Sequence, residues 1–321
     1  MRMRSWLAGS SLGLLAWSRI GDAHAAPAGI EELRAEPPAP RPIVGGEPTE
    51  AGDFDGVVAV VAGSGLCTGT VVAPRLVLTA AHCLAGLRQD TEIEVYFGQE
   101  INAADKVAAT DYGVHPMFCP DCKEDIYDYG YVVIASDFTV PDGFLLPITT
   151  QDEWDEAMVD GREVTLVGYG EDPEIEALNK GIGVKREVTT TVRRFSDRGL
   201  EFYAGGMHRD SCNGDSGGPA FIRVGSGALR LAGITSRGSN PCGDGGYYGT
   251  PYPALCWVRD ETGVDLIGPN CSACDCLDIA TDDDEGCAVA RPRERDDERG
   301  SLALLVVLAT LQRWRSRRRA G

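Results

Sequence analysis

From Ile43 onward, short apolar runs alternate with stretches rich in Gly, Pro and Asp. The runs contain many β-branched residues and are too short for amphipathic helices, so they predict β-strands. Many short strands at roughly regular spacing are typical of an antiparallel barrel or sandwich. A short helix is expected only at 152–159, so the predicted fold class is all-β. The strands are expected at 57–61, 70–72, 76–79, 92–97, 131–134, 163–167 and 229–234.

The N-terminal residues do not follow this pattern. Arg2 and Arg4 precede a largely apolar stretch at 6–17, and Ala23 and Ala25 give the small-x-small pattern of a signal-peptidase site. The sequence therefore predicts a signal peptide over 1–25 and export of the chain. Residues 26–42 are rich in Pro, Ala and Glu without apolar periodicity, and we expect them to form a pro-segment.

The pattern of short strands ends near Gly268, so residues 43–268 are the predicted folded domain. We expect 269–299 to be a linker rich in Cys and Asp that lies outside the folded core. Residues 300–321 hold a short apolar segment followed by a basic end. The apolar segment is too short for an ordinary membrane-spanning helix, so these residues are expected to form a tail.

Charge and cysteine content narrow the function classes. The chain has 30 Lys and Arg against 49 Asp and Glu, a net charge of −19. A nucleic-acid partner is therefore not expected, because a phosphate backbone needs a basic surface. Eleven cysteines in 321 residues indicate disulfides and an oxidising compartment, in agreement with the predicted export.

Two segments carry candidate chemistry for nucleophilic catalysis. His82 follows an apolar run in Leu78-Thr79-Ala80-Ala81-His82-Cys83, and Ser216 lies in Gly214-Asp215-Ser216-Gly217-Gly218-Pro219. Glycines beside a serine allow a tight bend that exposes the hydroxyl and directs backbone N–H groups into one small space. A histidine supplies the base that such a serine needs.

Together with Ile43-Val44-Gly45-Gly46, these segments resemble the trypsin-like serine protease family, which has the chymotrypsin fold. The resemblance runs from Ile43 to about Ile267. It implies two six-stranded antiparallel β-barrels packed together, with the catalytic site between them. It also implies Ser216 as nucleophile, His82 as general base, and an oxyanion hole made by the N–H groups of Gly214 and Ser216.

The resemblance also assigns the remaining roles in catalysis and activation. The third catalytic residue should directly precede an apolar strand; Asp128 and Asp125 both qualify, and Asp128 is favoured because it puts the strand in register. The α-amino group of Ile43, released by cleavage, is expected to pair with Asp215 and order the oxyanion loop. Pro42 makes the bond before Ile43 an unusual site for a trypsin-like activator.

Substrate preference is likewise implied by the resemblance. Asp210, six positions before Ser216, matches the residue at the base of the specificity pocket and predicts cleavage after Arg or Lys. Ser236, Gly238 and Gly246 are expected to line that pocket. Arg237 stands where the family usually has an aromatic residue; it either favours acidic residues upstream of the cut or folds over Asp210.

The resemblance predicts the disulfides Cys67–Cys83 and Cys212–Cys242. A local Cys119–Cys122 disulfide is favoured over a redox motif, and Cys256 is expected to pair with a cysteine after Gly268. The segment around Cys287, with the apolar run and arginines that follow, resembles C-terminal sorting signals of surface proteins in myxobacteria and their relatives. That resemblance implies attachment to the cell surface.

The sequence thus predicts a secreted or cell-surface serine endopeptidase, monomeric, that acts on polypeptides through an acyl-enzyme intermediate. No cofactor and no metal ion are expected. Two functions of other classes stay open. One is a catalytically inactive, protease-like binding module at the cell surface, and the other is a redox protein that uses Cys119 and Cys122.

Overall fold

A computed structural model describes residues 43–88, 90–171, 181–268, 271 and 276–279. The predicted signal peptide, pro-segment and C-terminal tail lie outside these residues, and so does Cys287. Those assignments therefore stay predictions.

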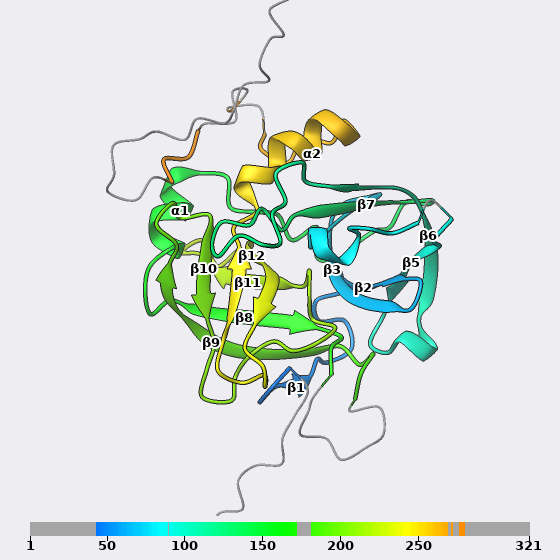
Figure 1. The fold of residues 1–321 in the computed structure, drawn as a ribbon, viewed down its shortest axis with the longest axis horizontal. Helices are drawn as coiled ribbons and strands as arrows, with labels where there is room; N and C mark the ends of the chain where they lie inside the picture. Colours follow the sequence, from blue (N-terminus) through cyan, green and yellow to red (C-terminus); the bar gives the residue numbers. More distant parts are fainter. Residues whose placement is uncertain (1–42, 89, 172–180, 269–270, 272–275, 280–321) are drawn as a thin grey trace, which may run out of the picture. The chain divides into compact units, whose positions relative to one another are not determined.

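Six strands form the first barrel, on the right in Figure 1. Each strand pairs antiparallel with its neighbours, and the barrel closes in the order β2-β3-β4-β7-β6-β5. Its interior is filled by valines and other apolar side chains, among them Val60, Val77, Val95 and Val132, each at most 1 % exposed. The strands are β2 (Val57–Ala62), β3 (Gly65–Ala73), β4 (Leu76–Thr79), β5 (Ile93–Phe97), β6 (Asp105–Val114) and β7 (Gly130–Ile134).

The second barrel follows in the chain and is also antiparallel. Its strands run in the order β9-β10-β13-β12-β11-β8, and pairing of β8 with β9 closes the ring. The short strand β1 (Glu47–Pro48) adds to β9 from outside. The strands are β8 (Glu163–Gly168), β9 (Arg186–Phe195), β10 (Glu201–Ala204), β11 (Pro219–Arg223), β12 (Leu229–Gly238) and β13 (Gly246–Gly249).

Two closed six-stranded antiparallel barrels confirm the predicted fold class. Every strand expected from an apolar run is present, but strands β1, β6, β9, β10, β11 and β13 were not predicted. Strand β6 (Asp105–Val114) has no buried residue, and β9 (Arg186–Phe195) carries charged and threonine side chains at many positions. Backbone hydrogen bonds to neighbouring strands form these two strands. Such bonds do not require apolar side chains, so the sequence carries little apolar pattern there.

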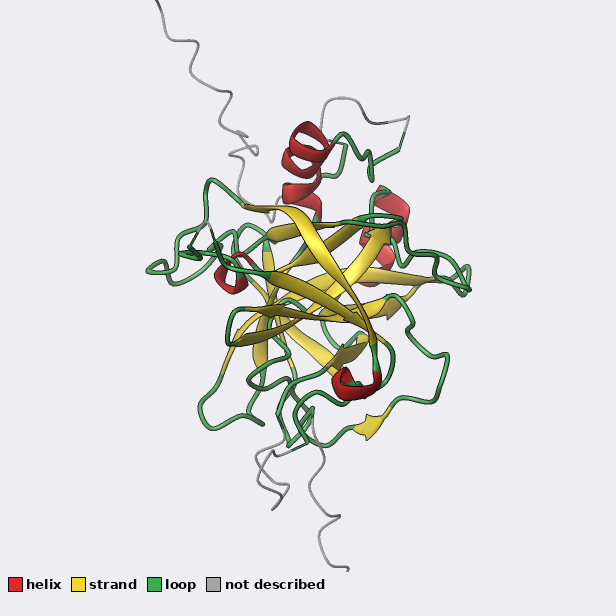
Figure 2. Ribbon diagram, turned by 90° about the vertical axis from the view of Figure 1, so that its right-hand side faces the viewer, coloured by secondary structure: helices red, strands yellow, loops and turns green. Residues whose placement is uncertain are grey.

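Helices are few among the described residues and lie at the edges of the barrels (Figure 2). Helix α1 (Gln151–Ala157) is the predicted one, and the Thr150 hydroxyl caps it by accepting the N–H of Glu153. Helix α2 (Leu255–Thr262) was not predicted. Three single turns complete the set: η1 (Ala81–Cys83), η2 (Ile101–Ala103) and η3 (Tyr252–Ala254).

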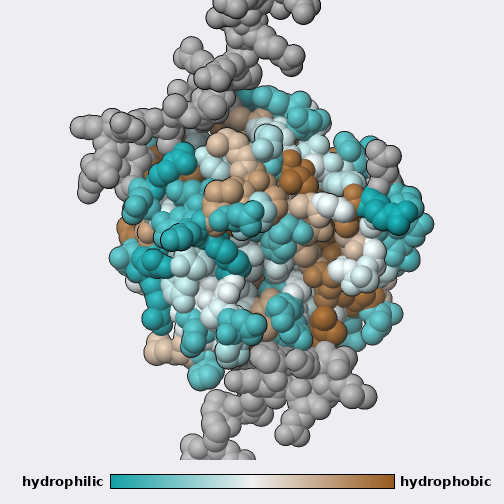
Figure 3. All heavy atoms as spheres, viewed as in Figure 1, coloured by the Kyte–Doolittle hydropathy of each residue, from teal (hydrophilic) through white to brown (hydrophobic). Residues whose placement is uncertain are grey.

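No described helix has the length and apolar character needed to cross a bilayer. In Figure 3, hydrophilic residues cover much of the second barrel, and apolar residues gather over part of the first. The polar cover agrees with the strongly negative charge of the chain.

The folded domain extends beyond Gly268, contrary to the expectation that the following residues lie outside the core. Cys271, Leu277 and Ile279 are at most 7 % exposed and belong to the larger hydrophobic core cluster, which contains residues of both barrels. The Tyr252 hydroxyl accepts the N–H groups of Cys276 and Leu277, at 2.8 and 3.0 Å. These apolar residues are visible in the sequence, but the surface against which they pack forms only when the barrel has folded.

Replacing Leu277 by Ala should lower the free energy of unfolding by about 2–5 kcal/mol, because it opens a cavity in a packed core. Leu146, which is 39 % exposed, offers the control: Leu146→Ala should change stability far less. Thermal and urea unfolding of both variants measure the difference. Equal, small losses would mean that residues 276–279 contribute nothing to the folded domain.

Candidate active site

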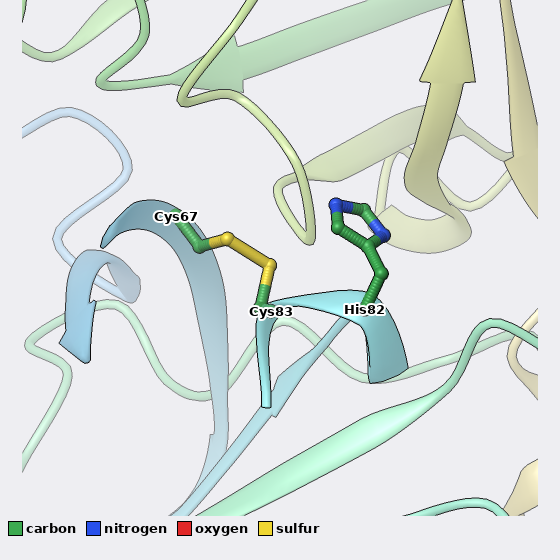
Figure 4. A group of neighbouring side chains, drawn as sticks. All are labelled: Cys67, His82 and Cys83. Carbon is green, nitrogen blue, oxygen red and sulfur yellow. A yellow bond between two sulfur atoms is a disulfide. The ribbon is translucent and has the colours of Figure 1, made fainter. Parts of the chain in front are cut away.

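His82 lies in the turn η1, directly after strand β4 of the first barrel. Strand β4 ends at Thr79, and the small buried residues Ala80 and Ala81 let the chain turn closely against the barrel. The His82 side chain is 36 % exposed. A disulfide joins Cys83 to Cys67 on β3 and ties the turn down. Figure 4 shows the imidazole ring beside this disulfide.

The group Cys67, His82 and Cys83 brings metal-binding residue types together but does not suit a metal ion. The two sulfur atoms are bonded to each other and offer no thiolate. Nδ1 of His82 is already 2.7 Å from the Asp128 carboxylate. Only Nε2 of His82 is left as a ligand, and a protein zinc site needs three or four.

Asp128 is the carboxylate against His82. Its Oδ1 accepts the backbone N–H of His82 at 2.8 Å, and its Oδ2 lies 2.7 Å from the ring Nδ1. The Ser236 hydroxyl donates a third hydrogen bond, to Oδ2 at 2.7 Å. A carboxylate can only accept, so Nδ1 carries the proton and Nε2 keeps its lone pair free. Asp125, the alternative candidate, instead accepts a hydrogen bond from Ser196.

The loop that carries Ser216 is bonded to both barrels. On the first barrel, the Thr68 N–H donates to the Ser216 carbonyl at 2.8 Å, and the Thr68 hydroxyl donates to the Gly214 carbonyl at 2.9 Å. On the second, the Gly217 N–H donates to the Thr235 carbonyl at 2.7 Å. These contacts place Ser216 at the junction of the barrels.

Glycine is required on both sides of Ser216. Gly214 and Gly217 have φ of 96° and 80°, which side chains rarely tolerate. A Cβ at Gly217 would lie 2.0 Å from Thr79 Oγ1, and one at Gly214 would lie 2.8 Å from the Cα of Gly170. Among the described residues, the N–H groups of Gly214 and Ser216 donate to no protein acceptor, so both remain available to a ligand.

Asp215 is a buried carboxylate with few partners. It is 1 % exposed, and it accepts the N–H groups of Gly170 and Cys212, both at 2.8 Å. Burial raises the pKa of Asp215 to about 7, although these hydrogen bonds act in the opposite direction. Ile43, its predicted partner after cleavage, is 1 % exposed and belongs to the core cluster that both barrels share.

A cavity of about 260 Å³ opens beside Ser216. Ser236, Gly238 and the disulfide-bonded pair Cys212 and Cys242 line it, as do Ser211, Asn213, Thr235, Arg237, Ser239 and Asn240. Of the four residues predicted to form the specificity pocket, Ser236 and Gly238 line this cavity, whereas Asp210 and Gly246 do not.

Asp210 lies behind the cavity wall. It is fully buried, and its carboxylate accepts the N–H groups of Gly245 at 2.9 Å, Gly243 at 3.3 Å and Ser211 at 2.8 Å. Burial raises the pKa of Asp210, and these donors oppose the shift. A Cβ at Gly246 would lie 3.4 Å from both Asp210 Oδ1 and Ser211 Oγ, so Gly246 leaves the space between them open.

Arg237 pairs with a residue that was not considered from the sequence. Its guanidinium forms two hydrogen bonds with the buried carboxylate of Glu201, at 2.9 and 2.7 Å, and lies 4.2 Å from the Tyr247 ring centroid. It therefore does not fold over Asp210, and its charge is balanced by Glu201. Glu201 was missed in the sequence, although a lone glutamate in the apolar run of β10 is a visible signal.

Two further disulfides among the described residues join cysteines that are close in the sequence. Cys119 and Cys122 form a disulfide in the loop before Asp128, and Cys271 pairs with Cys276. Cys256 is also disulfide-bonded.

The sequence matches the trypsin family model over residues 43–255. The chain belongs to the trypsin family. The match covers both barrels and every site residue described above. The two-barrel fold agrees with this family membership.

Several curated proteins are similar to this chain. The trypsin-like protease of Streptomyces glaucescens is 27 % identical over 252 residues, which cover 73 % of this chain and 86 % of that protein. Trypsin of Saccharopolyspora erythraea is 28 % identical over 211 residues, with coverage of 61 % and 86 %. Human Serine protease 56 is 31 % identical over 221 residues, which cover 64 % of this chain.

Some of these relatives are much longer than the matched domain. The matches span 58 % of Melanization protease 1 from Drosophila melanogaster and 35 % of human Serine protease 56. What is shared with them is the protease domain.

The raised pKa of Asp215 predicts a pH-dependent stability of the uncut chain. The unfolded chain releases this proton near the ordinary pKa of 3.8, and the folded chain only near 7. The folded state therefore binds more protons between these values, and its stability should fall as pH rises from about 4 to about 7.

Asp215→Asn removes this titration. The difference between wild type and variant in the free energy of unfolding, measured with urea from pH 4 to 8, should therefore change with pH. Asp142→Asn, at an exposed position, is the control and should follow the wild type. A difference in the free energy of unfolding that stays constant with pH would contradict the raised pKa of Asp215.

Proposed function

We propose that this chain is a secreted serine endopeptidase that cleaves polypeptides after Arg or Lys, with Ser216, His82 and Asp128 as its catalytic residues. The observation that carries the proposal is the hydrogen-bonded pair of His82 and the buried Asp128, next to a cavity lined by Ser216. Four disulfides among the described residues support an oxidising location.

In the proposed reaction, His82 Nε2 accepts the Ser216 proton as Oγ attacks the scissile carbonyl. Asp128 keeps the proton on Nδ1 and stabilises the imidazolium that forms. The N–H groups of Gly214 and Ser216 bind the oxyanion, and loss of one such donor typically costs about 3 kcal/mol of barrier lowering. His82 then gives this proton to the leaving amine as the scissile C–N bond breaks, which leaves Ser216 acylated. A water molecule that His82 deprotonates attacks the acyl-enzyme, and the proton passes to Ser216 Oγ as the carboxylic acid product leaves.

Asp210 supports a preference for basic residues through charge. A substrate cation that reached it would find a carboxylate already oriented by three backbone N–H groups. For activation, we propose that the new α-amino group of Ile43 pairs with Asp215, which lacks a cationic hydrogen-bond partner among the described residues.

A form that begins at Ile43 tests the proposed catalysis. Ser216→Ala should abolish turnover of fluorogenic peptides that carry Arg or Lys before the scissile bond, because the nucleophile is lost. Ser226→Ala, in an exposed turn, should retain full activity. A folded protein without turnover of any peptide would instead support a binding module.

Asp210→Asn tests the proposed specificity. It should lower kcat/KM for Arg and Lys peptides by roughly 30- to 5,000-fold, the effect of removing one partner from a buried charge pair. Peptides with Phe or Ala should be little affected. Asp244→Asn makes the same change at an exposed carboxylate of the neighbouring loop and should leave the Arg preference intact. Turnover of Phe or Ala peptides by the wild type would refute the role of Asp210.

A further inference from the structure

The ion pair of Arg237 and Glu201 lies next to the catalytic carboxylate. Arg237 on β12 meets Glu201 on β10 through two parallel hydrogen bonds, a geometry that fixes both side chains. The Glu201 side chain is 3 % exposed and that of Arg237 is 28 % exposed. Arg237 directly follows Ser236, whose hydroxyl donates to Asp128.

Both members of the pair also hold the loop that leads to Asp128. Glu201 Oε1 accepts the N–H of Ile126 at 3.1 Å, two residues before Asp128. Arg237 Nη2 donates to the carbonyl of Lys123 at 3.0 Å. The loop is therefore fixed at two backbone positions by side chains of the second barrel.

This loop has a costly backbone conformation. Asp125 and Tyr127 have φ of 52° and 51°, values that non-glycine residues seldom adopt. Such residues persist only where the surrounding structure holds them in place. Ile126 lies between them, and its N–H is the group that Glu201 accepts.

We propose that Glu201 and Arg237 are positioning residues: together they hold residues 123–127 so that Asp128 meets His82 and Ser236. The inference rests on the proposed function of the site and goes beyond the catalytic residues themselves. The charge of Arg237 serves this contact and not the recognition of acidic substrate residues, because Glu201 neutralises it.

A second ion pair on the same strand gives a matched control. Arg230 on β12 binds Glu153 of α1 through two oxygens, at 2.9 and 3.0 Å, and its side chain is also 28 % exposed. This pair touches neither the Asp128 loop nor the cavity beside Ser216. Removing it tests the cost of losing an Arg–Glu pair from β12 without disturbing Asp128.

The test compares two double variants of the form that begins at Ile43, Glu201→Met/Arg237→Met and Glu153→Met/Arg230→Met. Replacing both partners leaves no uncompensated charge and does not change the net charge. We expect kcat to fall about 10- to 100-fold in the first, because a misplaced catalytic group costs that much, and to stay within about 2-fold in the second. The melting temperatures of both double variants show how much of each fall in kcat comes from a loss of stability.

A third variant separates positioning from charge. Glu201→Gln/Arg237→Met keeps an amide oxygen that can accept the Ile126 N–H. It should recover part of the lost kcat if the hydrogen bond to the loop matters. Equal kcat in the first double variant and its control would overturn the proposal, and so would a third variant no better than the first.

A spectroscopic readout keeps this inference distinct from the proposed function. The proton on His82 Nδ1, hydrogen-bonded to Asp128, gives a proton NMR resonance downfield of the amides. It should weaken or shift in Glu201→Met/Arg237→Met and persist in the Glu153→Met/Arg230→Met control. This outcome in a protein without turnover would support the positioning role while the proposed function failed. If the wild type is active and the resonance is the same in Glu201→Met/Arg237→Met as in the wild type, the positioning role is overturned and the proposed function stands.

Discussion

The buried carboxylate of Asp128 joins the two barrels at the site. A buried charge is costly unless hydrogen bonds surround it, and Asp128 takes its donors from both sides. His82 in the first barrel supplies the backbone N–H and Nδ1, and Ser236 on β12 supplies the hydroxyl. These three contacts form together only when the edges of both barrels lie in one relative position, so the orientation of the imidazole depends on how the barrels pack.

The loop that carries Ser216 also depends on contacts with both barrels, but these contacts are made by its backbone. It has no regular structure of its own, and Thr68 from one barrel and Thr235 from the other hold its backbone. Side chains beside Ser216 would block these contacts, which is why Gly217 packs against Thr79 and Gly214 against Gly170. The glycines seen in the sequence thus permit a close approach between barrels as well as a tight turn. Ser216 is placed by elements that are distant in the chain and adjacent only after folding.

The difference between local motifs and contacts of distant residues explains what could be predicted from the sequence. Strands with buried apolar residues, such as β2 and β4, were visible, but β6 was hidden because it is partly exposed along its whole length. His82, Asp128 and Ser216 could be proposed from the sequence because each lies in a local motif next to a strand or a glycine turn. The contact of Glu201 with Ile126 spans 75 residues, and no local pattern records it. The position of Asp210 behind the cavity wall depends in the same way on the loop at 243–245.

Among the described residues, the buried aspartates Asp128, Asp210 and Asp215 differ in how their charge is stabilised, and that difference bears on activation. Asp128 and Asp210 each have at least three donors, but Asp215 has two backbone N–H groups, and its pKa rises to about 7. A cation at Asp215 would stabilise its charged form. Ile43 is buried and has a φ of 39°, an unfavourable value for a β-branched residue. A free N-terminal residue has no φ angle. Cleavage before Ile43 would therefore remove this strain and create the ammonium group that Asp215 lacks, so both changes favour the same activated state.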